Sequence, residues 1–323
     1  MTTDTDAGPS RIKEKLKGLL PRTSEQEVAT DASQEIASWT SSRRISDDQS
    51  MHSSEFPYFS MQHKRRGTAL IFNIEHFKYM PTRRGTDRDE KHLEQCLRKL
   101  GFDVVVKENS TADQIKREII SGKSVLFIST AAQEDHRDDD CFLCVFLTHG
   151  DDGVIHGSDS LTSKPHTSVK LQEDVFDQFR GEKCETLIGK PKIFVIQACR
   201  GETFESGVLE ADSVEVDSKM AKAEVEEGNK PTIPSGADFL ICYSSSQGFY
   251  SFRNTQDGSW YVSALCEELT RHGTEEELTK ILTKVHHRVS RRSSKSSDPT
   301  VAGKKQMPCY ASMLTKQLLF SSR

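Results

Sequence analysis

From residue 68 onward, short apolar runs alternate along the chain with longer stretches whose apolar positions recur every three or four residues. Runs of the first kind predict buried strands, and the second pattern predicts helices with one apolar face. We expect strands at 68–73, 102–106, 141–147, 192–196 and 237–243, and helices at 87–100, 111–120 and around 171–179. Strand alternating with helix favours an α/β fold whose mainly parallel sheet is covered by helices on both faces.

Two more helices and a last strand complete the predicted domain. Apolar residues in 262–269 fall on one helical face, and Gly273 ends that helix. The following helix is predicted to begin at Thr274–Glu277, which matches a capping box, and its apolar positions continue to Val289. The closing segment 310–320 supplies a last strand, so the sheet is expected to have six.

Two segments interrupt this pattern. Residues 1–62 are rich in Ser, Thr, Asp, Glu and Gln, and predict a mostly disordered leader. Within the leader, 10–20 has an apolar and a basic helical face, which is typical either of a helix docking on a membrane or partner or of a transient helix without a fixed role. The acidic segment around 213–234 predicts an exposed linker, so 63–323 together form one domain.

Composition restricts the possible partners and location. The chain has 323 residues, 34% of them hydrophobic and 29% charged, with a formal net charge of −5. That charge argues against nucleic acid or a membrane surface as the main partner. No apolar run approaches the roughly 20 residues that span a bilayer, and the N-terminus lacks the features of a signal peptide. A cytoplasmic location is therefore expected.

The eight cysteines are scattered along the chain, which suits a reducing compartment. Cys141 and Cys144 form a CxxC pair, but they fall in a predicted buried strand. Positions three apart on a strand point to opposite faces, so the pair is better explained as core than as a metal or redox site. No second pair completes a zinc site, and we predict neither a metal nor a cofactor.

Candidate chemistry lies just after two of the predicted strands. His149 follows the strand 141–147, and Cys199 follows the strand 192–196. Ligands of an open parallel sheet bind at the carboxyl ends of its strands, so these residues are expected to meet at one rim of the sheet. A thiol beside an imidazole favours nucleophilic catalysis, because the imidazole promotes formation of the thiolate.

The segment from about 67 to 320 resembles the caspases, the aspartate-directed cysteine proteases, and in particular the executioner type. Gln197–Gly201, with a His about 50 residues upstream, matches the known local signature of this family. Further similar segments are Arg83–Asp87, Gly189–Lys192, Phe249–Asn254, Gly258–Trp260 and Lys304–Gln306. The resemblance implies a caspase-like sandwich that consists of a large and a small subunit after cleavage.

The resemblance also implies catalytic roles. Cys199 would attack the peptide carbonyl, and His149 would protonate the leaving amine. The backbone N–H groups of Gly150 and Cys199 would hold the oxyanion. The backbone carbonyl of Pro81 would orient His149, a role that proline retains because it keeps its C=O.

Specificity for a P1 aspartate is implied by two arginines, Arg83 and Arg253, together with the amide of Gln197 and with Ser251. Guanidinium groups bind a carboxylate in a bidentate manner better than lysine does. The same pair argues against a metacaspase-like protease, which cleaves after Lys or Arg and would need carboxylates in its pocket.

The outer subsites are implied in the same way. Residues similar to the family's apolar S2 walls are Tyr250, Phe252 and Val301, and those similar to its S4 positions are Asn254 and Trp260. The next loop, 290–297, is polar and basic where better-known executioners carry aromatic residues. Such a loop favours acidic P4 or P5 residues, or it is a solvated face, and the sequence leaves both open.

An enzyme that cuts after Asp is expected to process its own linker, at Asp212 or Asp217. Cleavage would separate a large subunit, 63–212, from a small one, 235–323. Asp6 and Asp31 are candidate leader sites, and the Ala that follows each resembles the N-terminal residue that inhibitor-of-apoptosis proteins bind. The resemblance further implies an upstream initiator caspase and a homodimer of large–small pairs.

Two alternatives remain open at this stage. A catalytically silent homologue acting as a decoy would lack a Cys, a His or a pocket Arg, and none is missing. Basophilic kinase motifs end near Ser46 and Ser294, although such motifs are common by chance.

Overall fold

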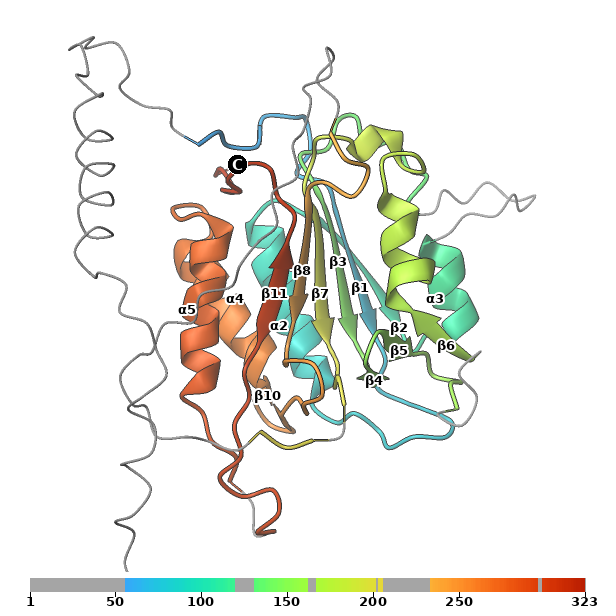
Figure 1. The fold of residues 1–323 in the computed structure, drawn as a ribbon, viewed down its shortest axis with the longest axis vertical. Helices are drawn as coiled ribbons and strands as arrows, with labels where there is room; N and C mark the ends of the chain where they lie inside the picture. The colour runs from blue at the N-terminus through green and yellow to red at the C-terminus, as the bar shows by residue number, and fades with distance from the viewer. Residues whose placement is uncertain are drawn as a thin grey trace, which may run out of the picture. The chain divides into compact units, whose positions relative to one another are not determined.

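The computed structural model describes residues 56–119, 131–161, 167–201, 203–205, 233–295 and 298–322. Its centre is a six-stranded sheet with the order β11-β8-β7-β3-β1-β2 (Figure 1). The strands are β1 (Thr68–Asn73), β2 (Asp103–Glu108), β3 (Phe142–Leu147), β7 (Lys192–Gln197), β8 (Phe239–Tyr243) and β11 (Cys309–Ser312). All neighbours pair in parallel except β11, which pairs with β8 in the antiparallel sense. The predicted α/β fold with a mainly parallel six-stranded sheet is confirmed.

Helices cover both faces of the sheet (Figure 1). One face carries α2 (Thr86–Lys99), α4 (Trp260–His272) and α5 (Leu278–Ser290), and the other carries α3 (Ala112–Ile119). Two apolar clusters correspond to these two layers. β3 supplies both of them, because its side chains alternate between the faces and all six of its residues are buried. Cys141 accordingly belongs to one cluster and Cys144 to the other, as the spacing predicted.

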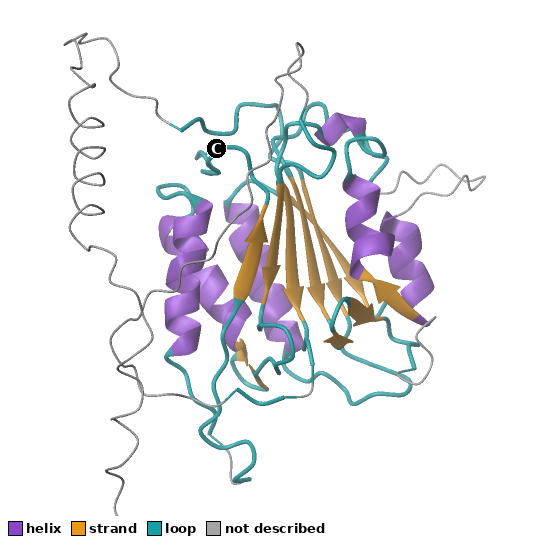
Figure 2. Ribbon diagram, viewed as in Figure 1, coloured by secondary structure: helices purple, strands orange, loops and turns teal. Residues whose placement is uncertain are grey.

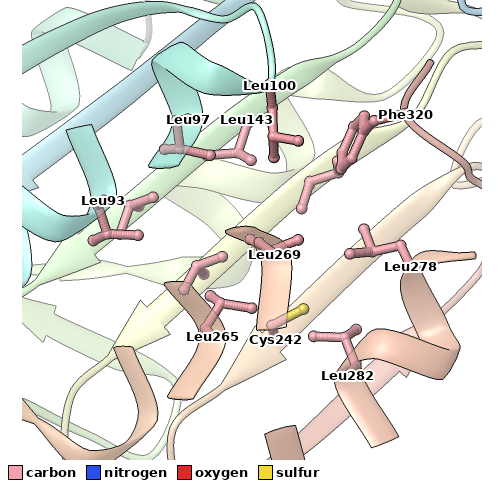
Figure 3. A pocket seen from close by; sticks show the side chains of 13 residues that line it. Leu93, Leu97, Leu100, Leu143, Cys242, Leu265, Leu269, Leu278, Leu282 and Phe320 are labelled. Atoms are coloured by element: carbon pink, nitrogen blue, oxygen red, sulfur yellow. The ribbon is translucent and has the colours of Figure 1, made fainter. Parts of the chain in front are cut away.

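The layer formed by α2, α4 and α5 meets the sheet through leucines (Figure 3). Leu93, Leu97, Leu265 and Leu269 line a small, wholly apolar cavity of about 20 Å³ together with Phe320 and residues of the central strands. Side chains from both sides of the 213–234 linker therefore share one core.

We expect Leu265→Ala to lower the free energy of unfolding by about 2–5 kcal/mol, because it removes buried methyl groups and enlarges this cavity. Urea denaturation followed by fluorescence measures the change. Val105→Ala is the matched control, since Val105 is exposed on β2, and its change should stay near zero. Equal losses in the two variants would contradict this picture of the core.

Three boundaries differ from the sequence predictions. The described chain begins at Phe56, and Phe59 and Met61 are buried in the core, so the predicted boundary at residue 62 lies too late. The segment around 171–179 is a short π-helix, Leu171–Val175, followed by a 3₁₀ turn, Phe176–Phe179. The last strand spans only Cys309–Ser312 of the predicted 310–320 region.

The predicted capping box at Thr274–Glu277 is also wrong. Glu277 itself is the N-cap of α5, and its carboxylate accepts the backbone N–H groups of Thr279 at 2.8 Å and Lys280 at 3.2 Å. Residues 274–276 instead form the turn that closes α4, where the N–H groups of Glu275 and Glu276 donate to the carbonyl of His272. The unsatisfied carbonyls at the end of α4 thus take the N–H groups of the residues that the sequence pattern assigns to the start of α5.

Short strands and loops gather at the carboxyl ends of the central strands (Figure 2). They comprise β4 (Gly150–Asp151), β5 (Val154–His156), β6 (Ser168–Lys170), β9 (Arg253–Asn254) and β10 (Gly258–Ser259). We call this edge the carboxyl rim. No helix in the described part of the chain is long and apolar enough to cross a membrane.

Candidate active site

His149 and Cys199 follow neighbouring strands and reach the carboxyl rim in register. Leu147 of β3 pairs with Gln197 of β7, and the N–H of Thr148 donates to the carbonyl of Gln197 at 3.2 Å. His149 comes two residues after Leu147, and Cys199 comes two residues after Gln197. The two residues therefore follow neighbouring strand ends at the same level of the sheet. The expected meeting of His149 and Cys199 at one rim agrees with this register.

Gly150 lies against the backbone of Cys199. A Cβ atom at Gly150 would come within 2.8 Å of the Val154 carbonyl oxygen, 3.0 Å of Ala198 Cβ and 3.4 Å of the Cys199 carbonyl oxygen. Contacts this short leave no room for a side chain. Glycine is therefore required here for a close backbone approach beside Cys199.

His149 is held from two sides. Its Nε2 lies 2.9 Å from the carbonyl oxygen of Pro81, which is the contact that the resemblance implied. The ring of Phe77 lies 4.8 Å from the imidazole, centroid to centroid. Carbonyl and ring together fix the tilt of the imidazole and leave Nδ1 to face away from Pro81.

Burial, together with the cationic Arg83 and Arg253, lowers the pKa of His149 to about 4, against the opposing effect of the hydrogen bond to the Pro81 carbonyl. The imidazole is therefore neutral at pH 7, and it can accept a proton from a thiol. This refines the sequence-based view, in which the imidazole favours a standing thiolate. Before substrate binds, two nearby cations oppose a charged imidazolium.

We expect the folded protein to keep His149 unprotonated at pH 6, where a free imidazole of pKa 6.5 would be mostly charged. The folded pKa is depressed, so stability contributed by the neutral ring declines as pH falls from 6.5 toward 4. ¹⁵N NMR titration of labelled imidazoles, with His149→Asn to assign the signal, measures this directly. A midpoint near 6.5 in the folded protein would contradict the expectation.

Arg83 and Arg253 lie together beside this pair. Arg83 is only 1% exposed, and its Nη1 donates to the Ile74 carbonyl at 3.2 Å and to Thr86 Oγ1 at 2.9 Å. Arg253 is half-buried and donates from Nε to the Arg84 carbonyl at 3.0 Å. Burial lowers the pKa of both, and that of Arg83 falls to about 9, so both stay protonated at neutral pH.

One acid lies behind the two arginines. Asp89, on the first turn of α2, is fully buried and accepts the Ser259 N–H at 2.7 Å through Oδ1. Its other oxygen has no hydrogen-bond partner among the described residues. In the described part of the chain, no carboxylate forms an ion pair with Arg83 or Arg253. The charges of Asp89 and of the half-buried Glu75 both act on the two cations, but neither acid pairs with them, so the pocket keeps unpaired positive charge.

Gln197 and Ser251 form another wall. The Gln197 amide lies 2.6 Å from Ser251 Oγ, and its remaining oxygen is buried without a partner in the described chain. Exchanging the amide O and N satisfies this geometry better, because the Ser251 hydroxyl then donates to Gln197 and the NH₂ group faces the pocket. In that orientation Gln197 offers a donor to an anionic ligand.

Aromatic residues line the rim beyond these groups. Phe252 stacks on Trp260 at 4.8 Å, and Tyr250 stacks on Phe204 at 4.5 Å. Gln306 fixes this segment: it accepts the Phe252 N–H at 2.7 Å and donates to the Ser244 carbonyl at 2.6 Å.

An open pocket of about 720 Å³ continues outward from Phe252 and Arg253. Its walls include the predicted subsite residues Asn254, Trp260 and Val301, together with Arg292 and Lys295 of the basic loop. Five of the predicted substrate residues, Phe252, Arg253, Asn254, Trp260 and Val301, therefore line one pocket. The structure also adds two cations at the outer end of this pocket.

Ser294 does not have the exposure of a kinase site. It is buried, its hydroxyl donates to the Val301 carbonyl, and its Oγ accepts the Lys304 N–H at 2.8 Å. These bonds fix the base of the basic loop. The second kinase motif is therefore better explained as part of the loop structure.

Several predicted residues lie outside the described part of the chain. These are the cleavage candidates Asp6, Asp31, Asp212 and Asp217, the kinase candidate Ser46 and the amphipathic stretch 10–20. Within the described residues, no group of three or more His, Cys, Asp and Glu side chains could hold a metal ion.

Sequence reasoning missed Phe77, Asp89 and Phe204. Phe77 lies in a loop, so no periodic pattern marks it. Asp89 is one of several acids in the first turn of α2, and only its burial distinguishes it. Phe204 belongs to the short described piece 203–205, which precedes the acidic segment.

Comparisons with known proteins identify the family. Residues 66–319 match the family model described as the caspase domain. The chain is 42% identical over 268 residues to caspase-6 of Gallus gallus, covering 81% of this chain and 83% of that protein. It is 40% identical over 268 residues to caspase-7 of the same species, covering 81% and 79%.

A solved structure extends the likeness to the fold. The crystal structure of caspase-1 from Spodoptera frugiperda matches with a TM-score of 0.70 and 36% identity, covering 84% of this chain and 98% of that one. The class defined by the fold and these matches is the cysteine-type endopeptidase. The chain belongs to the caspase family.

Proposed function

We propose that this protease cleaves protein substrates after aspartate, as an executioner-type caspase. The observation that carries the proposal is the pair of guanidinium groups, buried Arg83 and half-buried Arg253, beside Cys199 and His149. Neither forms an ion pair with a carboxylate among the described residues, although the charges of Asp89 and Glu75 act on both. An aspartate side chain that enters from the cleft brings the missing negative charge and accepts bidentate hydrogen bonds.

A short anionic side chain fits this pocket better than its competitors. A P1 lysine or arginine would add a third cation beside Arg83 and Arg253, and like charges in a desolvated pocket are costly. An apolar P1 residue would leave the guanidinium groups and the Gln197 amide without new partners. These contrasts support discrimination in favour of aspartate.

The reaction follows from the positions of the groups. The neutral imidazole of His149 takes the proton from the Cys199 thiol as sulfur attacks the peptide carbonyl, which forms a C–S bond and an oxyanion. Backbone N–H groups of Gly150 and Cys199 donate to that oxygen. The imidazolium then gives the proton to the departing amine, the C–N bond breaks, and water hydrolyses the thioester through the same imidazole.

Substrate charge assists this proton transfer. In the free enzyme, Arg83 and Arg253 lower the pKa of His149. A bound P1 carboxylate neutralises part of that charge, so the imidazolium becomes easier to form once the correct substrate is in place. Recognition and proton transfer are therefore coupled through the two arginines.

The outer pocket supports a DEVD-like preference with an acid at P4. Arg292 and Lys295 border the open pocket beyond Trp260, where the fourth residue of an extended peptide would lie. Their charges attract a carboxylate, although exposed ion pairs contribute only about 0–1 kcal/mol. We therefore propose a modest preference for acidic P4 or P5 residues.

The remaining proposals concern activation and cellular role. The chain would be a zymogen in the cytoplasm, cut at Asp212 and Asp217 by itself and by an upstream initiator caspase. Large and small subunits would pair and then form a homodimer that executes apoptosis. Cleavage at Asp6 or Asp31 would expose an N-terminal Ala for inhibitor-of-apoptosis proteins. The similarity to proteins named caspase-6, caspase-7 and caspase-3 supports the executioner type.

Hydrolysis of a fluorogenic Asp-Glu-Val-Asp reporter by the purified protein tests the proposed function. We expect turnover, and a several-fold lower kcat/KM when P4 is changed from Asp to Val. Folded protein without turnover would favour the decoy alternative. Equal kcat/KM values for Asp and Val at P4 would show that Arg292 and Lys295 do not select the P4 residue. That result would leave the proposed P1 specificity unaffected.

A further inference from the structure

Two cysteines face each other between helices that lie on opposite sides of the linker in the sequence. Cys96 is on α2 and Cys266 is on α4, and both are buried, at 3% and 7% exposure. Cys96 Sγ lies 3.8 Å from the Cys266 carbonyl oxygen. The two thiols also interact with one another, and each changes the pKa of the other. The Cys96 thiol thus lies against Cys266 on the facing helix, where rotation of the side chains can bring the two sulfurs together.

A pocket separate from the active site leads to this pair. It has a volume of about 380 Å³, and Cys96 and Cys266 line it together with His92, Lys99, Thr270 and Arg271. A small solute such as hydrogen peroxide can therefore reach the sulfurs. The lining also contains Glu267, which pairs with Arg271 at 3.7 Å, so Lys99 is the cation that favours a thiolate at Cys96.

The two thiols differ in acidity. A hydrogen bond from Cys266, another with Thr270 and the charge of Lys99 lower the pKa of Cys96, whereas the bond to Cys96 and burial raise that of Cys266. One thiol is therefore suited to attack an oxidant and the other to resolve the product.

We propose that Cys96 and Cys266 form a peroxide-responsive dithiol, whose oxidation to a disulfide joins α2 to α4. Cys96 thiolate attacks one oxygen of hydrogen peroxide, the O–O bond breaks, and hydroxide leaves with sulfenic acid formed on Cys96. The Cys266 sulfur then attacks that sulfenic sulfur, loses its proton, and expels the second hydroxide. Two electrons pass from the sulfurs to the peroxide, and the products are one disulfide and two water molecules.

The position of the pair gives the bond a consequence for the substrate pocket. The first turn of α2 contains Thr86, which binds Arg83, and Asp89, which binds the N–H of Ser259 next to α4. A disulfide further along the two helices would restrain the elements that carry Arg83 and Arg253. If the linker is cut as proposed above, the same bond would also join the two subunits covalently.

The Cys199→Ala chain is suited to the test, because it carries no active-site thiol and needs no activity for the readout. After treatment with hydrogen peroxide and alkylation, non-reducing peptide mapping should find the Cys96 and Cys266 peptides cross-linked with loss of two hydrogen atoms. Dithiothreitol should release them. The melting temperature should rise on oxidation and return on reduction.

Cys96→Ala and Cys266→Ala, each added to Cys199→Ala, should abolish the cross-link and the shift in melting temperature. Cys309→Ala is the matched control, since Cys309 is the other partly exposed thiol, and it should leave both intact. Two results would overturn the proposal: both thiols still alkylated after peroxide, or Cys96 converted to sulfinic acid without a cross-link. Neither result bears on cleavage after aspartate, so the two accounts fail separately.

Discussion

Cys199→Ala is expected to abolish hydrolysis of an Asp-Glu-Val-Asp reporter, with a loss of kcat on the order of 10⁵–10⁶-fold, as for the nucleophile of other covalent proteases. The change removes the sulfur atom that follows β7 two residues after the Leu147–Gln197 pair, just as His149 follows β3. Alanine cannot form an acyl-enzyme. Binding of the P1 side chain should persist, because Arg83 and Arg253 are untouched.

The same variant tests processing. Expressed in bacteria, the unaltered chain should appear as two fragments cut after Asp212 or Asp217, and Cys199→Ala should remain a single chain. Mass spectrometry of the purified protein gives the cut positions. Fragments of the same mass in the variant would show that a host protease, rather than the chain itself, makes the cut.

Arg253→Gln is expected to lower kcat/KM for a P1 aspartate by roughly 10²–10³-fold, since breaking a buried charge pair costs about 3–5 kcal/mol. Half of the bidentate recognition is lost, and the substrate carboxylate is left beside a single cation, Arg83. A smaller loss of kcat/KM is expected for a peptide that carries asparagine instead of aspartate at P1, because asparagine makes no ion pair. The ratio of kcat/KM for aspartate to kcat/KM for asparagine should therefore fall.

Arg84→Gln is the matched control for this change. Arg84 is exposed, and it contributes only its backbone carbonyl to Arg253, which the substitution keeps. Its kcat/KM should stay within about twofold of the original. A loss as large as that of Arg253→Gln would indicate that the loop, rather than the charge, controls recognition.

Much of the fold could be predicted from the sequence because the pattern of buried strands is simple. β3 and β7 are buried at every residue, and their sequences are apolar throughout in β3 and from Ile193 to Ile196 in β7. The rule that ligands bind at carboxyl ends then locates His149 and Cys199. The start of α5 was missed because Thr274 satisfies the same motif whether it caps a helix or lies in the preceding turn.

The site was harder to derive from spacing than from resemblance. Arg83 and Arg253 are far apart in the sequence, and nothing in their local patterns shows that they share a pocket. Tertiary structure also creates the low pKa of His149, because burial and two cations from other segments combine there. The same holds for Cys96 and Cys266, each of which reads locally as an ordinary core cysteine.

The central claim is that excess positive charge beside Cys199 selects aspartate at P1. The most direct test compares kcat/KM of the purified enzyme for two peptides that differ only by Asp or Asn at P1. Aspartate and asparagine have nearly the same shape, so the ratio isolates the charge. The account predicts a preference for aspartate of roughly 10²–10³-fold. Similar kcat/KM values for the two peptides would contradict it.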